Sequence, residues 1–165
     1  MSVDDFSQYV ATRWARLVRS AVLLGATPPE AEDIVQTALE KCLRNWVKVV
    51  RADDVDAYVH RVLINTFTSS RRRRWTHERP TETFPDEVTA DESARVDDTD
   101  AVVRALQHLT ADQRHVVVLR YYAHLSEQQT ATALGVPPGT VKSRLARALR
   151  ALSEDPNLRE LRGSR

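Results

Sequence analysis

The fold is decided by residues 126–149, which read SEQQTATALGVPPGTVKSRLARAL. Ala131 places a small side chain on a first helix, and Gly135 follows four residues later, where a left-handed turn suits glycine. Val136 fills the angle between two helices, and residues 137–140, PPGT, open the second. This spacing is typical of a helix-turn-helix, whose second helix enters the major groove of DNA.

The second helix of this motif has one apolar side and one cationic side. Its apolar side carries Val141, Leu145, Ala148, Leu149 and Leu152. Its opposite side carries Lys142, Ser143, Ala146, Arg147 and Arg150, with Arg144 near the boundary. A plain helical hairpin with a solvated basic face is the alternative, but such a hairpin has no need of the Ala–Gly–Val placement. We therefore interpret the motif as DNA-binding.

The charge of the chain, +1 in total, is unevenly distributed. Residues 1–75 carry 12 Lys and Arg against 9 Asp and Glu, which is a net charge of +3. Residues 76–100 carry 2 against 9, a net charge of −7, and residues 101–165 carry 10 against 5, a net charge of +5. Two basic blocks on either side of an acidic stretch indicate two modules that face a polyanion.

Helical periodicity fills the N-terminal half of the chain. One helix ends at Gly25, a second starts after Thr27 and runs to about Val50, and a third spans residues 57–72. The second helix is expected to turn inward Ile34, Val35, Ala38, Leu39, Cys42, Leu43 and Trp46.

The periodicity disappears between residues 76 and 100. Pro80, Pro85 and nine acidic residues leave too little apolar surface there to offset the entropy of ordering. The stretch is predicted to be a flexible acidic linker. It either occupies a basic channel built for nucleic acid or serves as a solubilising spacer.

Helices resume at Ala101, with capping-box patterns at residues 110–113 and 126–129. No alternation typical of strands is visible in the sequence. It predicts an all-α fold of two small helical domains joined by a flexible acidic linker. The predicted boundaries are 1–75 for the first domain, 76–100 for the linker and 101–165 for the second domain.

Cysteine and histidine usage limits the chemistry. Cys42 is the only cysteine, which excludes a disulfide framework and a thiolate metal cluster. The five histidines have no metal-binding spacing, and no nucleophile elbow or phosphate loop is present. We therefore expect no enzyme activity and no metal or other cofactor. The start lacks the features of a signal peptide, and no run approaches the roughly 18 apolar residues of a membrane span, so we expect a soluble, cytoplasmic protein without membrane insertion.

Three segments, in this order, resemble the extracytoplasmic-function sigma factors of the sigma-70 family. Residues 31–40, AEDIVQTALE, resemble the helix of region 2 that binds core RNA polymerase. Residues 56–66, DAYVHRVLINT, together with the arginines that follow, resemble the segment that melts and reads the −10 element. Residues 139–148, GTVKSRLARA, resemble the recognition helix of region 4. The length and the early Phe6…Arg13-Trp14 stretch look most like the actinobacterial SigE-type branch.

The resemblance implies a protein that binds core RNA polymerase, directs it to a −35/−10 promoter, opens the duplex and is then released, without a cofactor. Its polymerase partners are the clamp helices of the β′ subunit and the flap of the β subunit, and many relatives are restrained by an anti-sigma factor. The residues that the resemblance assigns to the clamp helices are Asp33, Gln36 and Leu39. Those for the −10 element are Asn65, Arg61, Arg71, Arg72, Arg73 and Arg74. Those for the −35 element are Lys142, Ser143, Arg144 and Arg147.

The residues themselves agree with part of this reading. Opening a duplex requires unstacked bases to be captured, and such bases stack on aromatic faces in cationic grooves. The four arginines and Trp75 supply those groups just beyond the third helix, although they could also be a solvated helix end. Asn65 could equally be an amide on the helix surface. Thr130, where the family usually has an aliphatic residue, and Pro138 depart from the family pattern.

Two other functions compete with this one. A stand-alone helix-turn-helix transcription regulator would use residues 1–75 as a sensory or dimerising domain. It would need a ligand pocket or a phosphoacceptor aspartate at the end of a strand, and the sequence predicts no strand. An enzyme with a helical fold would need a catalytic constellation that the sequence does not offer.

Overall fold

The computed structural model describes residues 3–77 and 93–163, and every element in these two ranges is helical. The all-α prediction is therefore confirmed for the described residues. In chain order the elements are α1 (Val3–Leu24), α2 (Pro28–Arg44), α3 (Trp46–Val50), α4 (Val55–His77), α5 (Ser93–Gln107), α6 (Ala111–Val117), η1 (Val118–Tyr122), α7 (Glu127–Leu134), α8 (Pro138–Glu154) and α9 (Pro156–Gly163).

The boundary between α1 and α2 follows the predicted signals. Gly25 ends α1 with a φ of 121°, a backbone conformation that favours glycine. The backbone N–H of Thr27 then donates to the carboxylate of Glu30 at 3.2 Å, and prolines occupy the first positions of α2. The predicted second helix ends earlier than expected, because the chain leaves helical geometry at Asn45 (φ −119°) before α3 begins.

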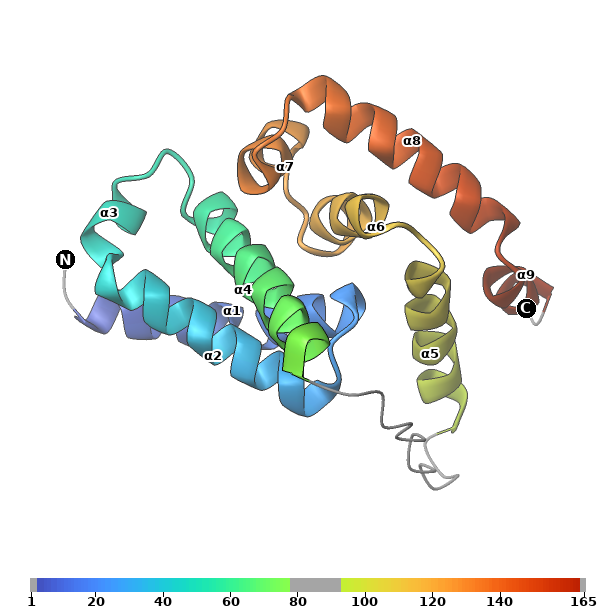
Figure 1. Ribbon diagram of the computed structural model, residues 1–165, viewed down its shortest axis with the longest axis horizontal. Helices are drawn as coiled ribbons and strands as arrows, with labels where there is room; N and C mark the ends of the chain where they lie inside the picture. The colour runs from blue at the N-terminus through green and yellow to red at the C-terminus, as the bar shows by residue number, and fades with distance from the viewer. Residues whose placement is uncertain (1–2, 78–92, 164–165) are drawn as a thin grey trace.

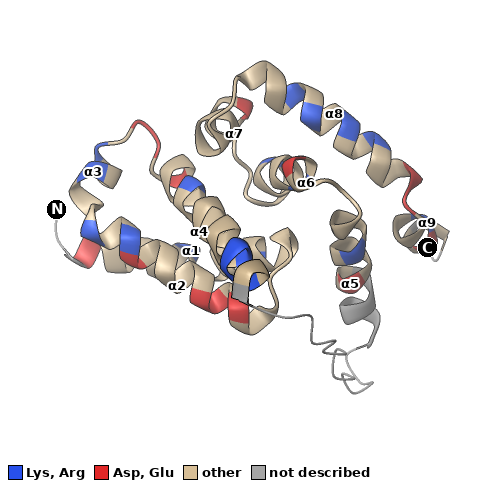
Figure 2. Cartoon of the chain, in the orientation of Figure 1, with Lys and Arg blue, Asp and Glu red and all other residues tan. Residues whose placement is uncertain are grey.

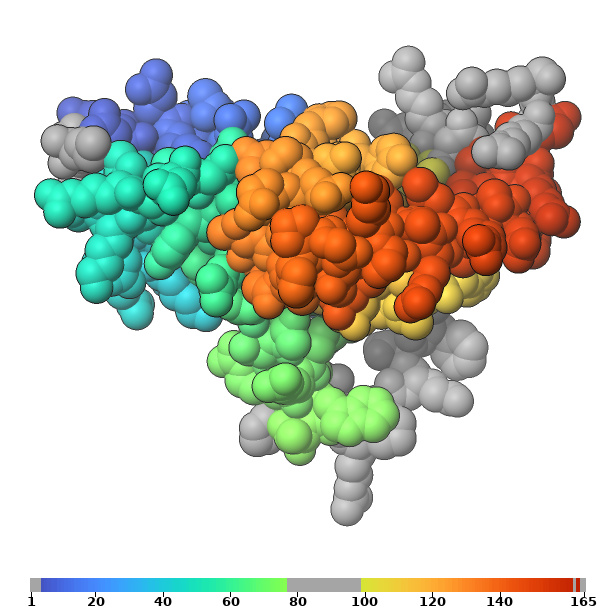
Figure 3. Space-filling model, turned by 90° about the horizontal axis from the view of Figure 1, so that it is seen from above, coloured from blue at the N-terminus to red at the C-terminus, as the bar shows by residue number. Residues whose placement is uncertain are grey.

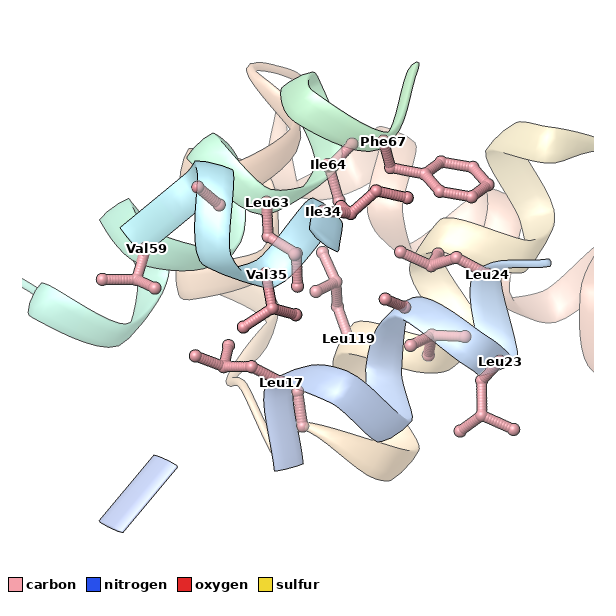
Figure 4. Close-up of a cluster of buried hydrophobic side chains, with 14 of the residues drawn as sticks. Leu17, Leu23, Leu24, Ile34, Val35, Val59, Leu63, Ile64, Phe67 and Leu119 are labelled. Carbon is pink, nitrogen blue, oxygen red and sulfur yellow. The ribbon is translucent and has the colours of Figure 1, made fainter. Parts of the chain in front are cut away.

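Helices α1, α2 and α4 form the body of the N-terminal half (Figure 1). Their shared core contains Leu17, Val35 and Leu63, which point toward one another between the three helices (Figure 4). Burial of such side chains is the main stabilising contribution in a small helical domain. The start of α4 is held to α1, since the Asp56 carboxylate accepts hydrogen bonds from Tyr9 at 2.8 Å and from Arg13 at 3.1 Å.

Helices α7 and α8 form the predicted helix-turn-helix. Gly135 lies at the turn with a φ of 66°, in the left-handed region that the sequence required. Ser126 and Gln129 form the predicted capping box at the start of α7. Val141 of α8 packs into a small cluster with Ala131 of α7 and Val116 of α6, and this cluster fixes the angle of α8.

The two halves of the chain pack against each other and share one core. Leu119 of η1 is 1% exposed and lies between the helices of the N-terminal half (Figure 4). Helix α7 packs against α4, as the ribbon and the space-filling view both show (Figures 1 and 3). Helical periodicity alone did not predict this packing.

The ends of the predicted linker are helical. Helix α4 runs to His77 and α5 begins at Ser93, and both residues lie inside the stretch 76–100. The rest of that stretch, 78–92, lies outside the described residues. Helix α9, after the helix-turn-helix, was not predicted from the sequence. None of the helices described is long and apolar enough to cross a membrane.

Candidate nucleic-acid interface

Helix α8 presents its cationic side away from the rest of the molecule. Lys and Arg residues recur along the length of α8 (Figure 2), and the exposed ones among them, Lys142, Arg147 and Arg150, form an outward cationic row. Lys142, Ser143 and Arg147 are exposed on that side, as predicted, and Arg150 continues it. Val141 and Ala148 are fully buried on the opposite side, which seats the helix on α6. The arrangement offers donors to the edges of bases in a major groove.

Leu149 differs from its predicted position, whereas Arg144 lies near the boundary between the two sides of the helix, as predicted. Arg144 is turned toward α6, where its Nη2 lies 3.4 Å from Oδ2 of Asp112. It is half-buried, so it does not join the outward row in this conformation. Leu149, expected on the apolar side, is 39% exposed. Both residues lie at the edges of the buried stripe, where helical periodicity discriminates least between inside and outside.

Two predicted −10 residues, Arg61 and Asn65, lie on the side of α4 that faces the C-terminal half. Both are exposed. Arg61 borders a hollow whose other wall is the start of α7, from Ser126 to Thr132. Asn65 borders a second hollow together with Arg144 of α8. The structure thus places these two exposed residues beside hollows that they share with residues 126–144.

The four predicted arginines at the end of α4 separate into two pairs. Arg71 donates to the carbonyl oxygen of Gly25 and lies over the Phe67 ring, 5.2 Å from its centre. Arg74 forms an ion pair with Glu30. The other pair, Arg72 and Arg73, is exposed.

Trp75 lies beside this pair and is 89% exposed, at the end of α4 that projects from the body (Figure 3). An exposed indole next to exposed guanidinium groups suits stacking on unpaired bases.

The predicted polymerase-binding residues on α2 are only partly on the surface. Asp33 and Gln36 are exposed, and Gln36 donates to Glu40 at 3.4 Å. Leu39, in contrast, is 5% exposed and belongs to the core, as its predicted inward position requires, so it does not lie on the exposed side of α2. The side chain one turn further on, Leu43, was expected inside and is 42% exposed.

Val47 of α3 adds a second exposed apolar side chain next to this surface, at 56%. Sequence reasoning did not identify either residue as exposed, because it expected one continuous helix to about Val50. In the structure α2 ends at Arg44 and the short α3 turns the chain in a new direction.

Two histidines near these surfaces are shielded from water, His60 as a buried and His115 as a half-buried residue. Burial lowers the pKa of His60, whose Nδ1 lies 2.7 Å from the carbonyl oxygen of Asp56. Burial also lowers the pKa of His115, which meets Phe67 edge to face with 6.5 Å between ring centres. Neutral imidazole is therefore favoured at both positions. In the described part of the chain, no three His, Cys, Asp or Glu side chains are grouped so that they could hold a metal ion.

Comparison with known families matches both halves of the chain. The pattern described as Sigma-70 region 2 matches residues 9–77, and the pattern described as Sigma-70, region 4, matches residues 99–152. The RNA polymerase sigma-E factor of Streptomyces avermitilis is 42% identical over 159 residues, which cover 96% of this chain and 89% of that protein. The ECF RNA polymerase sigma factor SigM of Mycobacterium tuberculosis is 35% identical, over 87% of this chain and 72% of that protein.

Two solved structures share the fold of both halves. The sigma factor RpoE in complex with the anti-sigma factor NepR, from Bartonella quintana, superposes with a TM-score of 0.73 at 27% identity and covers 92% of this chain and 96% of that one. CnrH in complex with the cytosolic domain of CnrY superposes with a TM-score of 0.68 at 23% identity, over 92% of this chain and 87% of that one.

Proposed function

The chain belongs to the extracytoplasmic-function sigma factors of the sigma-70 family, and we propose on this premise that its two halves divide promoter recognition between them. It is an RNA polymerase-binding factor for transcription initiation, and such factors are in general regulators and not catalysts. Residues 1–75 are proposed to bind core polymerase and the −10 element, and residues 101–165 the −35 element. We expect the protein to work in the cytoplasm, where promoter DNA and polymerase meet.

The outward cationic row of α8 is the observation that carries this proposal. A helix that is seated by buried Val141 and Ala148 and that exposes Lys142 and Arg147 has the geometry of a major-groove reader. Lysine and arginine donate to the acceptor atoms of guanine in that groove. Ser143 and Arg150 lie beside them and complete the proposed −35 surface.

The −10 element is assigned to one side and the far end of α4. Arg61 and Asn65 are proposed to contact bases of the melted strand, since both have exposed polar ends one helical turn apart. Arg72 and Arg73, with Trp75, are proposed to hold the backbone and to stack on an unpaired base. Arg71 and Arg74 act on DNA only if they leave Gly25 and Glu30.

The polymerase surface is assigned to the exposed side of α2 and the start of α3. Asp33 and Gln36 remain in it from the sequence prediction. Leu43 and Val47 take the place of Leu39 as its apolar centre. Exposed apolar side chains surrounded by polar ones are typical of protein-binding surfaces. The proposed partner is the clamp helices of β′, and region 4 is proposed to contact the flap of β.

An anti-sigma factor is the regulatory partner that we propose. The RpoE structure, which shares the fold over 92% of this chain, is held by an anti-sigma factor. A partner of that kind would keep both halves from polymerase until it is released.

Reconstituted transcription tests the function. Purified chain and core polymerase are combined on a library of promoter fragments, with each component alone as the control. We expect defined start sites only in the combined reaction. Tight and specific binding to a duplex operator without polymerase would instead support the stand-alone regulator.

A further inference from the structure

The hollow that Asn65 borders has the size of a small-molecule site. Its volume is about 650 Å³, within the roughly 300–1,000 Å³ that is typical of pockets for small ligands. Its lining comes from the end of α1, the middle of α4, the end of α5 and the helices α6, α7 and α8. Three arginines, Arg71, Arg114 and Arg144, are among the lining residues, and we refer to it as the arginine hollow.

Positive charge predominates in the arginine hollow. Arg71 comes from α4, Arg114 from α6 and Arg144 from α8, whereas Asp112 alone supplies a carboxylate among the described residues that line it. Three guanidinium groups against one carboxylate leave an excess of two positive charges. Concave sites lined by one sign of charge concentrate ligands of the opposite sign. The hollow is therefore expected to attract a small anion.

The cations in the hollow act on one another. Burial lowers the pKa of the Arg114 guanidinium, and the charge of Arg71 lowers it further. Burial also lowers the pKa of His115, the charges of Arg114 and Arg144 add to this effect, and Asp112 opposes it. The carboxylate of Asp112 thus leaves repulsion between the cations uncompensated, and a bound anion would relieve it.

Arg71 and Arg144 retain donors for such an anion. A guanidinium group has five N–H donors in a planar fork. Among the described residues, Arg71 donates to the carbonyl oxygen of Gly25, and Arg144 meets the carboxylate of Asp112 with 3.4 Å between Nη2 and Oδ2. Each of these contacts occupies one edge of the fork. The remaining donors suit phosphate oxygens, which arginine binds through paired hydrogen bonds.

Arg114 contributes a fixed charge. Its Nε donates to the carbonyl oxygen of Leu106 at 2.8 Å, and its Nη2 donates to those of Leu109 at 3.1 Å and Gln107 at 3.3 Å. These bonds hold the guanidinium group in place at the wall of the hollow. A ligand therefore meets a positive charge that is already positioned, which reduces the entropy lost on binding.

The rest of the lining is suited to a nucleoside. The amide side chains of Asn65 and Gln107 both border the hollow, and amides of this kind pair with the edges of nucleobases. Gly25 allows Gln107 to lie close to the main chain, because a Cβ atom at that position would be 3.0 Å from its Oε1. Ile64 and Phe67, which Figure 4 shows near Leu24, add apolar surface.

We propose that the arginine hollow binds a nucleoside diphosphate. The diphosphate would lie between Arg71 and Arg144, where it compensates the excess of positive charge, and the base would meet the amides of Asn65 and Gln107. This site goes beyond the proposed function, since binding there needs neither polymerase nor promoter. A DNA strand offers the same phosphate chemistry, but a hollow of this size would leave most of a strand outside.

Direct binding to the full-length chain tests the proposal. Isothermal titration is carried out with ADP, GDP, inorganic diphosphate, adenosine and a ten-nucleotide single strand of DNA. We expect ADP or GDP to bind at least roughly tenfold more tightly than inorganic diphosphate, and adenosine not to bind measurably. Equal affinities for the nucleotides and inorganic diphosphate would refute the nucleoside part. Binding of the DNA strand without binding of ADP or GDP would assign the hollow to DNA and overturn the proposal.

Gln107→Glu locates the ligand in the hollow. The substitution keeps the size of an exposed side chain and places a negative charge at the lining, so we expect the affinity for the bound nucleotide to fall at least tenfold. Gln128→Glu is the matched control, because it adds the same charge at an exposed position of α7 that does not line this hollow. Equal losses in the two variants would indicate general attraction to a cationic protein and refute the site.

Ala111→Trp tests the same site by volume. Ala111 is exposed at the first residue of α6 and lines the hollow, so an indole there would fill space that the nucleotide needs. We expect this variant to lose nucleotide binding and also the rise in unfolding temperature that a ligand of the folded state produces. Circular dichroism of the ligand-free variants verifies that each is folded. Retained binding in both Gln107→Glu and Ala111→Trp would place the nucleotide elsewhere and overturn the proposal.

Discussion

Asp112 of α6 holds Arg144 of α8, with 3.4 Å between Oδ2 and Nη2. The pair ties the recognition helix to α6 on the side away from the outward cationic row. An ion pair near the surface, with Arg144 half-buried and Asp112 exposed, stabilises a protein by at most about 1 kcal/mol. Arg144 must nevertheless leave Asp112 before it can contact DNA. The loss of this ion pair offsets part of the free energy that a new contact with DNA would contribute. The −35 surface therefore depends on Lys142 and Arg147 more than on Arg144.

Alanine substitutions on α8 should show this order. Lys142→Ala and Arg147→Ala are each expected to weaken −35 recognition by about 1–3 kcal/mol, the contribution of a contact to a base edge. Arg144→Ala should have a smaller effect. Initiation by reconstituted polymerase, compared between a promoter with an intact −35 element and one with a scrambled element, measures the loss. An Arg144→Ala defect as large as that of Arg147→Ala would place Arg144 among the readers.

Leu43 offers a test of the polymerase surface. Leu43→Asp is expected to reduce affinity for core polymerase about tenfold, because part of a buried leucine contributes on the order of 1–2 kcal/mol. The matched control is Val102→Asp, which changes an apolar side chain of similar exposure on α5. Co-migration with core polymerase at graded concentrations measures both. Equal affinities for the two variants would remove Leu43 from the surface.

Local signals in the sequence predicted the helix-turn-helix well. Gly135 and the capping box of Ser126 and Gln129 act within a few residues, so their conformations depend little on the rest of the chain. The predicted positions of Lys142 and Arg147 followed from that motif and from helical periodicity. The structure shows both residues on the exposed side of α8.

Non-local features were beyond such reasoning. Periodicity identified Leu39 and Leu43 as apolar but did not show which of them the break at Asn45 would leave outside. Arg144 is turned inward by a carboxylate more than thirty residues earlier in the chain. The packing of Leu119 between α1 and α4 depends on the surfaces of two halves that were each analysed alone. Contacts between distant elements leave no periodic signal in either segment.

Thr130 and Thr66 make a matched pair for stability. Both are buried, but Thr66 donates to the carbonyl oxygen of Val62 at 2.7 Å, whereas Thr130 Oγ1 has no hydrogen-bond partner among the described residues. Thr130→Val should therefore raise the free energy of unfolding by about 1 kcal/mol, and Thr66→Val should lower it by a similar amount. Urea unfolding followed by circular dichroism measures both. If both variants change the free energy of unfolding in the same direction, the hydrogen bond from Thr66 to Val62 does not contribute to stability.

His60 predicts a pH dependence of stability. Burial is the largest influence on its pKa and lowers it below the ordinary value of about 6.5, although the carbonyl group and charge of Asp56 oppose this, while Arg13 and Arg16 add to it. The unfolded chain therefore binds the proton more readily than the folded one. The stabilisation is complete above about pH 6.5 and is lost as the pH falls toward the folded pKa.

We expect the free energy of unfolding to decrease between pH 7 and pH 5, and to decrease less steeply in His60→Leu. His115 contributes in the same direction, because burial lowers its pKa too, so His60→Leu should retain part of the slope. The control is His124→Asn at an exposed position, where asparagine tolerates the left-handed backbone (φ 57°). Urea unfolding of the wild-type chain and of the two variants at half-unit pH steps gives the three slopes of unfolding free energy against pH. A His60→Leu slope equal to that of the wild-type chain would mean that His60 does not titrate differently on folding.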